Sequence, residues 1–241
     1  MRKLLSKMRQ AINDYNLIAD GDKIAVGLSG GKDSLTLLHL LNSYQKFSPE
    51  KFELIAITLN PGNVDNTPLH KLCKELDIEF HEIQTQISEI VFDIRKEKNP
   101  CSLCANLRRG ALNSSAAELG CNKVALGHHK DDAIETLMLS IAYEGRINCF
   151  SPKSYMHKNN ISLIRPMVYI DEALIRKTAK NYNFPIIQNP CPADGKTKRE
   201  DIKELIKELN IKIPGFKKNL FSSLTNTDQL FVWNKNDIRK M

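Results

Sequence analysis

The stretch Ile24-Ala25-Val26-Gly27-Leu28-Ser29-Gly30-Gly31-Lys32-Asp33-Ser34 decides the fold. It joins a short apolar strand to a helical run from Leu35, with two glycines at the turn. Glycines let backbone N–H groups approach an anion closely, the helix N-terminus adds a partial positive charge, and Lys32 adds a full one. We therefore expect the six residues from Ser29 to Ser34 to cradle the phosphates of a nucleotide.

Other motifs that begin in this way fit the residues less well. A Walker A loop places Ser or Thr directly after its Gly-Lys pair, whereas Asp33 follows Lys32 here. The Gly-x-Gly-x-x-Gly pattern of the Rossmann fold is missing. An ABC-transporter signature also begins Leu-Ser-Gly-Gly, but it lies downstream of a Walker A loop, and none precedes Leu28. A plain turn capped by Ser29 would leave Lys32 and Asp33 as coincidences, so the nucleotide interpretation is favoured.

Length and composition indicate the class of protein. The chain has 241 residues, 41% of them apolar, which suits one sizeable α/β domain with a small appendage. No apolar run is long enough to cross a membrane and the start lacks a signal-peptide core, so we expect a cytoplasmic protein with no membrane partner. Six cysteines then favour reduced thiols or metal ligands over disulfides. The net charge of +7 suits a polyanionic partner, although many other proteins are equally basic.

Strands and helices alternate along the chain. An amphipathic helix is expected at about residues 2–18, and strands at 24–28, 54–59, 78–83, 123–127 and 161–164. Further helices are expected at about 67–76, 101–119, 131–143, 171–182, 198–209 and 216–224. This order predicts an α/β fold with a mostly parallel, doubly wound sheet and ligands at the carboxyl ends of its strands. We expect an N-terminal helix (1–20), an ATP-binding domain (21–170) and a small helical C-terminal subdomain (171–241).

A pair of cysteines, Cys101 and Cys104, begins the long helix. Their spacing places both sulfurs on one face of the first turn, and Arg108 shares that face. The helix dipole and nearby arginines favour thiolates there. Taken alone, the pair is equally compatible with a metal site, a redox pair or two buried helix residues.

A further ligand is needed to close a metal site, and Cys191 is the best candidate. It lies in the proline-flanked loop Asn189-Pro190-Cys191-Pro192, where packing does not require a cysteine. Cys73, Cys121 and Cys149 are better explained as core or incidental residues. Three thiolates with one open position suit an iron–sulfur cluster or a zinc ion with an open site.

A second polar loop, Gly127-His128-His129-Lys130-Asp131-Asp132, also follows a strand and leads into a helix. Asp131 and Asp132 could simply cap that helix. However, the loop is expected to face the same crevice as the glycine loop, where a carboxylate could hold Mg²⁺ or orient the nucleotide. We accordingly expect Leu59, Gly127 and Asp131 to contribute to the nucleotide site, and Asp132 to act in catalysis.

Together these motifs resemble one family over nearly the whole chain. The sequence is similar to tRNA 2-thiocytidine synthetases, which are PP-loop ATP pyrophosphatases with an adenine nucleotide alpha hydrolase-like fold. The resemblance is carried by residues 11–18, 28–34, 101–110, 125–132, Glu135-Thr136, 164–166 and 184–187. It implies that Cys101, Cys104 and Cys191 hold a [4Fe–4S] cluster whose fourth iron is free. Asp194 stands where family members carry another cysteine, so we expect sulfide on the open iron instead of a cysteine relay.

The resemblance implies a concrete reaction. ATP and Mg²⁺ bind at the glycine loop, where Lys32 neutralises charge while Asp33 and Asp131 or Asp132 organise the metal ion. O2 of an anticodon-loop cytidine (position 32) is adenylated, and sulfur delivered near Arg108 displaces AMP to give 2-thiocytidine. The implied partners are tRNA, a sulfur donor (a cysteine desulfurase or sulfide) and a second copy in a homodimer. Basic residues near the cysteines are candidate RNA contacts: Arg108, Arg109, Lys196, Lys198 and Arg199.

Two other classes of function remain open from the sequence. One is a different PP-loop tRNA-modifying enzyme, acting by uridine thiolation or by lysidine-type ligation. A ligase of that kind needs no cluster and leaves the three cysteines unexplained. The other is a non-catalytic nucleotide- or RNA-binding module, which gives Asp33 no role.

Overall fold

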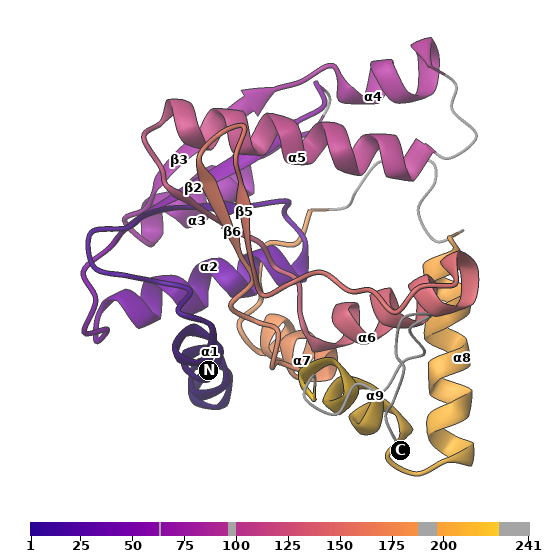
Figure 1. Cartoon of the computed structure of the whole chain (residues 1–241). Coiled ribbons are helices and arrows are strands. Elements are labelled where there is room, and N and C mark those ends of the chain that lie inside the picture. The colour runs from indigo at the N-terminus through magenta and orange to yellow at the C-terminus, as the bar shows by residue number, and fades with distance from the viewer. Residues whose placement is uncertain (63, 96–99, 188–196, 227–241) are drawn as a thin grey trace, which may run out of the picture. The chain divides into compact units, whose positions relative to one another are not determined.

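The computed structural model describes residues 1–62, 64–95, 100–187 and 197–226. Its centre is a six-stranded sheet with the order β3-β2-β1-β4-β6-β5 (Figure 1). The strands are β1 (Lys23–Gly27), β2 (Glu53–Asn60), β3 (Glu79–Gln84), β4 (Lys123–Ala125), β5 (Lys153–Met156) and β6 (Ile161–Ile164). All neighbouring pairs are parallel except β5 with β6. This confirms the predicted α/β class with a mostly parallel sheet.

The described residues also form nine α-helices. They are α1 (Arg2–Tyr15), α2 (Lys32–Gln45), α3 (Thr67–Glu75), α4 (Ile87–Glu89), α5 (Pro100–Glu118), α6 (Lys130–Leu139), α7 (Glu172–Asn181), α8 (Lys198–Lys212) and α9 (Phe216–Thr225). Two π-helical segments, η1 (Ile90–Ile94) and η2 (Ser140–Glu144), continue α4 and α6. Within the described residues, no helix combines the length and apolar character needed to cross a bilayer.

The chain forms two compact units, the first comprising residues 1–132 and 150–197 and the second 133–149 and 198–241. In the first unit, α1, α2, α3 and α7 pack on one face of the sheet and α5 on the other (Figure 1). Helices α1 and α7 thus contribute to the core of the first unit. The functional limits of the domains expected from the sequence stay a prediction. In the second unit, Ile134, Ile202 and Ile206 form a small apolar cluster.

The strand order reverses between β1 and β4. From β1 the chain adds β2 and β3 on one side, and then β4 and β6 on the other. At such a reversal the loops that follow the two central strands diverge to opposite faces and leave a crevice at the carboxyl ends of the strands. The loops after β1 and β4 are the two polar motifs singled out in the sequence.

Most expected elements are present, with informative differences at their ends. Helix α1 ends at Tyr15 because Asn16 adopts a left-handed conformation (φ 48°) that closes the helix. Helix α2 begins at Lys32 instead of Leu35, so Lys32, Asp33 and Ser34 belong to its first turn. Strand β5 was not predicted because Lys153–Met156 is a polar edge strand without apolar alternation.

The structure predicts a pH-dependent contribution of His39 to stability. The His39 ring of α2 stacks on Phe184 with 4.4 Å between ring centroids, and its Nε2 has no hydrogen-bond partner among the described residues. Burial lowers the pKa of His39 below its ordinary value of 6.5. The unfolded chain therefore binds the proton more tightly, and stability is lost as pH falls below about 6.5.

We expect His39→Leu to remove this part of the pH dependence. Denaturant unfolding of wild type and variant at several pH values between 8 and 5 measures it. The stability of the wild type relative to the variant should fall as the solution becomes more acidic. A difference between the two proteins that is constant with pH would contradict the prediction.

Candidate functional site

Hydrogen bonds of Ser34 shape the glycine loop. The Ser34 hydroxyl donates to the Gly31 carbonyl oxygen (3.0 Å) and accepts the Ser29 N–H (3.2 Å). Gly31 is the N-cap of α2 and, in the described structure, forms no side-chain capping bond. The first N–H groups of α2 are thereby left to an anion, as the sequence predicted for a phosphate cradle.

The chain after α7 covers the other side of this loop. Gly30 has a φ of +78°, a conformation that side chains disfavour, and an added Cβ would lie 3.0 Å from Cβ of Ile187. The Ile187 N–H also donates to the Gly30 carbonyl oxygen at 3.0 Å. A glycine at position 30 thus permits both the positive φ of the turn and the close approach of Ile187, which is far away in the chain.

Gly127, near the start of the loop that follows β4, touches the first turn of α2. A Cβ at Gly127 would lie 3.1 Å from both the carbonyl carbon of Asp33 and the backbone nitrogen of Ser34. Only glycine allows this contact without displacing the backbone. The two polar loops therefore meet, as expected from their positions after neighbouring strands.

Lys32 lies between two carboxylates. Its Nζ is 3.0 Å from Asp33 Oδ2 and 3.1 Å from Oε1 of the buried Glu172 at the start of α7. Burial opposes the charge of Lys32, but Asp33 and Glu172 together outweigh it and raise the pKa of the amine. Lys32 therefore stays protonated at the crevice and can neutralise phosphate charge.

His129 links the two loops through its ring. It precedes α6, where its N–H donates to Asp132 Oδ2 (2.9 Å) and its Nδ1 accepts the Asp132 N–H (3.4 Å), a reciprocal cap. Its Nε2 lies 3.6 Å from Asp33 Oδ1 and 3.4 Å from Asp132 Oδ2. The structure thus brings Asp33 and Asp132 close to the same nitrogen of one buried imidazole.

Asp33 has an oxygen suited to a cation. Its Oδ1 is buried and forms no hydrogen bond within the described parts of the chain. A buried carboxylate oxygen left in this way is costly unless a ligand or metal ion pairs with it. Carboxylate oxygens are the ligands that Mg²⁺ prefers, so Asp33, with Asp132 nearby, fits a magnesium ion at bound phosphates.

Asp131 joins the β4 loop to α7. Its Oδ2 accepts the backbone N–H of Glu172 at 2.8 Å, which caps the helix that carries the partner of Lys32. Leu59, also expected at the nucleotide site, is the penultimate residue of β2 and is half-buried beside the core that α5 covers. Roles for both residues in nucleotide binding stay a prediction.

The cysteine pair lies in the first turn of α5, as expected. Cys101 is exposed and Cys104 is half-buried, and Arg108 follows one turn later. Over the described ranges, no three His, Cys, Asp or Glu side chains are grouped to hold a metal ion. Cys191, Asp194 and Lys196 lie outside the described residues. The set of three cysteine ligands expected from the sequence thus remains a prediction. Burial raises the pKa of the Cys73 thiol to about 11, which agrees with a role of this residue in the core.

Two of the basic residues expected at RNA have contacts within the second unit. Arg199 Nη1 lies 3.5 Å from Glu135 Oε2. Lys198 Nζ lies 4.4 Å from the centroid of the Tyr143 ring. These contacts give both side chains a structural role and leave their RNA contacts as a prediction.

Comparisons with known proteins agree with this geometry. Residues 2–209 match the PP-loop domain family. A tRNA-cytidine(32) 2-sulfurtransferase from Geobacter metallireducens is 38% identical over 232 residues, which span 93% of this chain and 90% of that protein. The chain belongs to the tRNA-cytidine(32) 2-sulfurtransferase family. Another member, from Janthinobacterium sp., is 42% identical over 229 residues, 93% of this chain and 72% of its own.

A solved structure extends the family resemblance. The U34-tRNA thiolase NcsA from Methanococcus maripaludis, determined with its [4Fe-4S] cluster, superposes with a TM-score of 0.78 and 28% identity. The match covers 97% of this chain and 80% of that one. Because a uridine thiolase carries such a cluster, a cluster by itself does not distinguish cytidine from uridine thiolation in this fold.

Three residues at the site had no role assigned from the sequence: His129, Glu172 and Ile187. His129 lies in the same motif as the carboxylates Asp131 and Asp132. Its position immediately before a helix, three residues from Asp132, was the available signal of a cap. Glu172 and Ile187 reach the glycine loop through tertiary contacts only, and no local pattern marks them.

We expect Gly127→Ala to weaken ATP binding while the protein stays folded. The added methyl group meets the rigid backbone of Asp33 and Ser34, and such overpacking costs about 1–3 kcal/mol. Isothermal titration with ATP measures the loss. Gly110→Ala is the matched control, because a Cβ there meets nothing within 4 Å among the described residues. Equal ATP affinity in both variants would contradict the contact.

Substitutions of Asp33 and Asp131 are expected to affect different properties, activity in the first case and stability in the second. Asp33→Asn should keep the melting temperature but lower Mg²⁺-dependent pyrophosphate release by about 100-fold, because a metal-ligating charge is lost. Asp131→Ala removes the cap of α7 and should lower stability by about 1 kcal/mol. Thermal melts and a pyrophosphate assay on both variants separate the roles. Unchanged stability of Asp131→Ala would contradict the capping role.

Proposed function

We propose that this protein thiolates tRNA, using ATP to replace O2 of cytidine 32 with sulfur and form 2-thiocytidine. The observation that carries the proposal is the near full-length similarity to tRNA-cytidine(32) 2-sulfurtransferases from several bacteria, such as the 38% identity with the Geobacter metallireducens protein. The intact glycine loop, with Lys32 and Asp33 at the start of α2, supports ATP use by this chain.

The crevice between the β1 and β4 loops supports activation at the α-phosphate. The glycine loop binds the phosphates through the N–H groups of α2, and Lys32, held between Asp33 and Glu172, neutralises the leaving pyrophosphate. Asp33 and Asp132 hold Mg²⁺. Cytidine O2 attacks the α-phosphorus and pyrophosphate leaves, so C2 carries an adenylate and becomes electrophilic.

The donor set of the chain fits a [4Fe–4S] cluster. Cys101 and Cys104 lie three residues apart at the accessible start of α5, and Cys191 supplies the third thiolate. When bound, the cluster would hold at its open iron the sulfide that takes the place of the oxygen. A bond from C2 to sulfur forms, the bond to the adenylated oxygen breaks and AMP leaves, with no net change of oxidation state. Arg108, one turn from Cys104, offers a cation to the departing AMP.

The remaining partners follow from this reaction. The substrate is tRNA with an anticodon loop that can expose the cytidine, since a base in a stack cannot reach the crevice. Sulfur comes from a cysteine desulfurase or from free sulfide. We further propose that the protein acts as a cytoplasmic homodimer.

Nucleoside mass spectrometry of tRNA from cells with and without the gene tests the proposal. Deletion of the gene should abolish 2-thiocytidine. A wild-type copy should restore it, whereas copies with Asp33→Ala or Cys191→Ala should not. A second candidate is uridine thiolation, which the similarity to NcsA favours. If deletion removes a 2-thiouridine and leaves 2-thiocytidine unchanged, the substrate is a uridine and the proposal of cytidine 32 is wrong.

The cluster is tested separately on purified protein. Cys104→Ser and Cys191→Ser should lose most iron and sulfide when prepared without oxygen, along with activity. Cys149→Ser is the matched control, since this cysteine is half-buried and lies outside the proposed ligand set. Full iron and sulfide in the Cys191→Ser protein would refute the three-thiolate site.

A further inference from the structure

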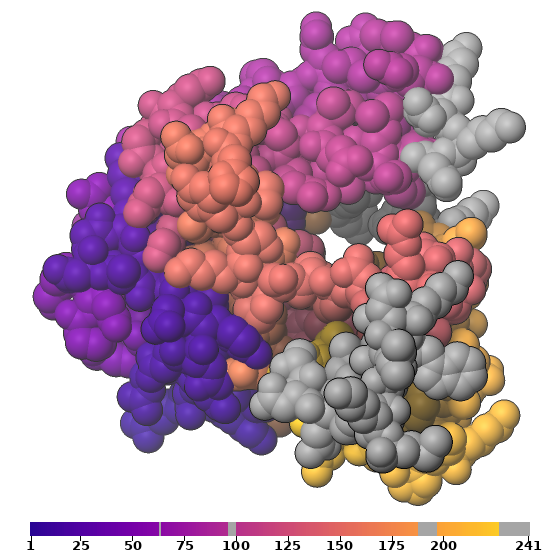
Figure 2. Space-filling model, in the orientation of Figure 1, coloured from indigo at the N-terminus to yellow at the C-terminus, as the bar shows by residue number. Residues whose placement is uncertain are grey.

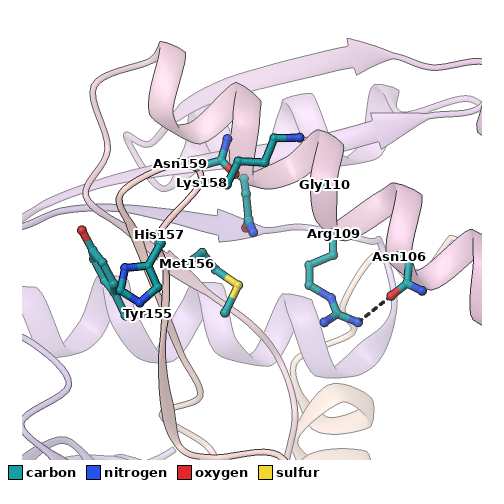
Figure 3. A pocket seen from close by; sticks show the side chains of 9 residues that line it. Asn106, Arg109, Gly110, Tyr155, Met156, His157, Lys158 and Asn159 are labelled. Carbon is teal, nitrogen blue, oxygen red and sulfur yellow. Dashed lines mark hydrogen bonds between the residues drawn. The ribbon is translucent and has the colours of Figure 1, made fainter.

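An open cavity of about 370 Å³ lies between α5 and the tip of the β5–β6 hairpin, within the first unit. The hairpin, in orange, lies at the surface beside α5 (Figure 2). Residues of both elements line the cavity, and among the described residues none of its lining side chains is acidic (Figure 3). The volume is in the range of small-ligand pockets.

The α5 side of the cavity is a polar stripe. Asn106, Arg109, Gly110 and Asn113 recur at the spacing of one helix face. Arg109 donates from Nη2 to Asn106 Oδ1 at 3.1 Å, which orients its guanidinium group (Figure 3). Gly110 adds no side chain, so the helix backbone itself is accessible there.

Asn113 supplies an unsatisfied polar group. Its side chain lines the cavity and is only 4% exposed, yet its Oδ1 has no hydrogen-bond partner within the described residues. An orphaned acceptor in a buried position is destabilising unless a ligand donates to it. The cavity therefore favours an occupant with N–H or O–H groups as well as negative charge.

The hairpin side adds an aromatic surface and a cation. The Tyr155 ring is half-exposed and meets the His157 ring edge-on, with 4.9 Å between centroids. Lys158 follows at the tip. Asn159 donates from Nδ2 to the Ser114 hydroxyl at 3.2 Å, which fastens the tip to α5. Tyr155, His157 and Lys158 thus line the hairpin side of the cavity, and Arg109 lines the α5 side.

We propose that this cavity binds an unstacked nucleotide of the RNA substrate. Arg109 and Lys158 contact its phosphate, Tyr155 stacks on its base, and Asn113 accepts a hydrogen bond from the base edge. The inference rests on the proposed function for the identity of the RNA. Arg109 is five residues beyond Cys104, about 7.5 Å along the helix axis, so RNA held here lies along the helix that begins with the cysteine pair.

Binding of fluorescent tRNA to the full chain tests the charged contacts. Arg109→Gln with Lys158→Gln should raise Kd about tenfold or more and reduce the slope of log K against log salt by about 2. Lys71→Gln with Lys74→Gln is the matched control: it removes two charges from exposed lysines of α3, which packs against the other face of the sheet. The control should bind tRNA much like wild type.

The base contact is tested with Tyr155. Tyr155→Ala should weaken tRNA binding about fivefold or more, because stacking is lost, whereas Tyr155→Phe keeps the ring and should bind like wild type. ATP affinity and melting temperature, measured on each variant, report whether the fold is intact. Equal weakening by Phe and Ala would contradict stacking.

The outcomes separate this inference from the proposed function. If wild type forms 2-thiocytidine but the cavity variants bind tRNA as the control does, the cavity proposal is wrong and the function stands. If wild type thiolates no tRNA yet binds it through Arg109, Lys158 and Tyr155, the function is wrong and the cavity proposal stands. Wild type that binds no tRNA would overturn the cavity proposal.

Discussion

The contact between Gly127 and the first turn of α2 is the constraint on which the site depends. Because the strand order reverses between β1 and β4, the loops that follow these strands border one crevice at the carboxyl ends of the strands. A missing side chain at Gly127 lets the β4 loop rest on the backbone of Asp33 and Ser34. That approach sets His129 and Asp132 beside Asp33, so the two carboxylates near the His129 ring come from two separate loops.

Charge and hydrogen bonding then connect a third segment to these loops. Asp131 caps α7 through the Glu172 N–H, and the Glu172 carboxylate in turn pairs with Lys32. Burial alone would weaken the charge of Lys32, but its two carboxylates keep the amine protonated. The same helix leads to Ile187, which closes over Gly30. The phosphate cradle is therefore held by α2, the β4 loop and the segment after α7 together.

Helix α5 serves different purposes on different faces. Its apolar residues, Leu112 and Ala116, pack on the sheet beside Ala25, Ile55 and Ile57. Its first turn carries Cys101 and Cys104, and the stripe from Asn106 to Asn113 faces the hairpin cavity. When a helix carries polar functional residues on more than one face, its polar and apolar residues are expected to be poorly separated around the axis. One rigid element can thus position both the cysteine pair and a contact for the substrate.

The sequence by itself determined the parallel α/β class, the glycine loop and the spacing of Cys101 and Cys104, because strand periodicity, turn chemistry and helix spacing are local properties. It placed the Gly127–Asp132 loop at the same crevice through a general rule of parallel sheets. Only the tertiary structure decided that Glu172 pairs with Lys32, that Ile187 covers Gly30, and that the polar edge strand β5 helps to form a cavity on α5. These contacts join segments far apart in the chain, and their partners are fixed by strand order and packing, which no local pattern records.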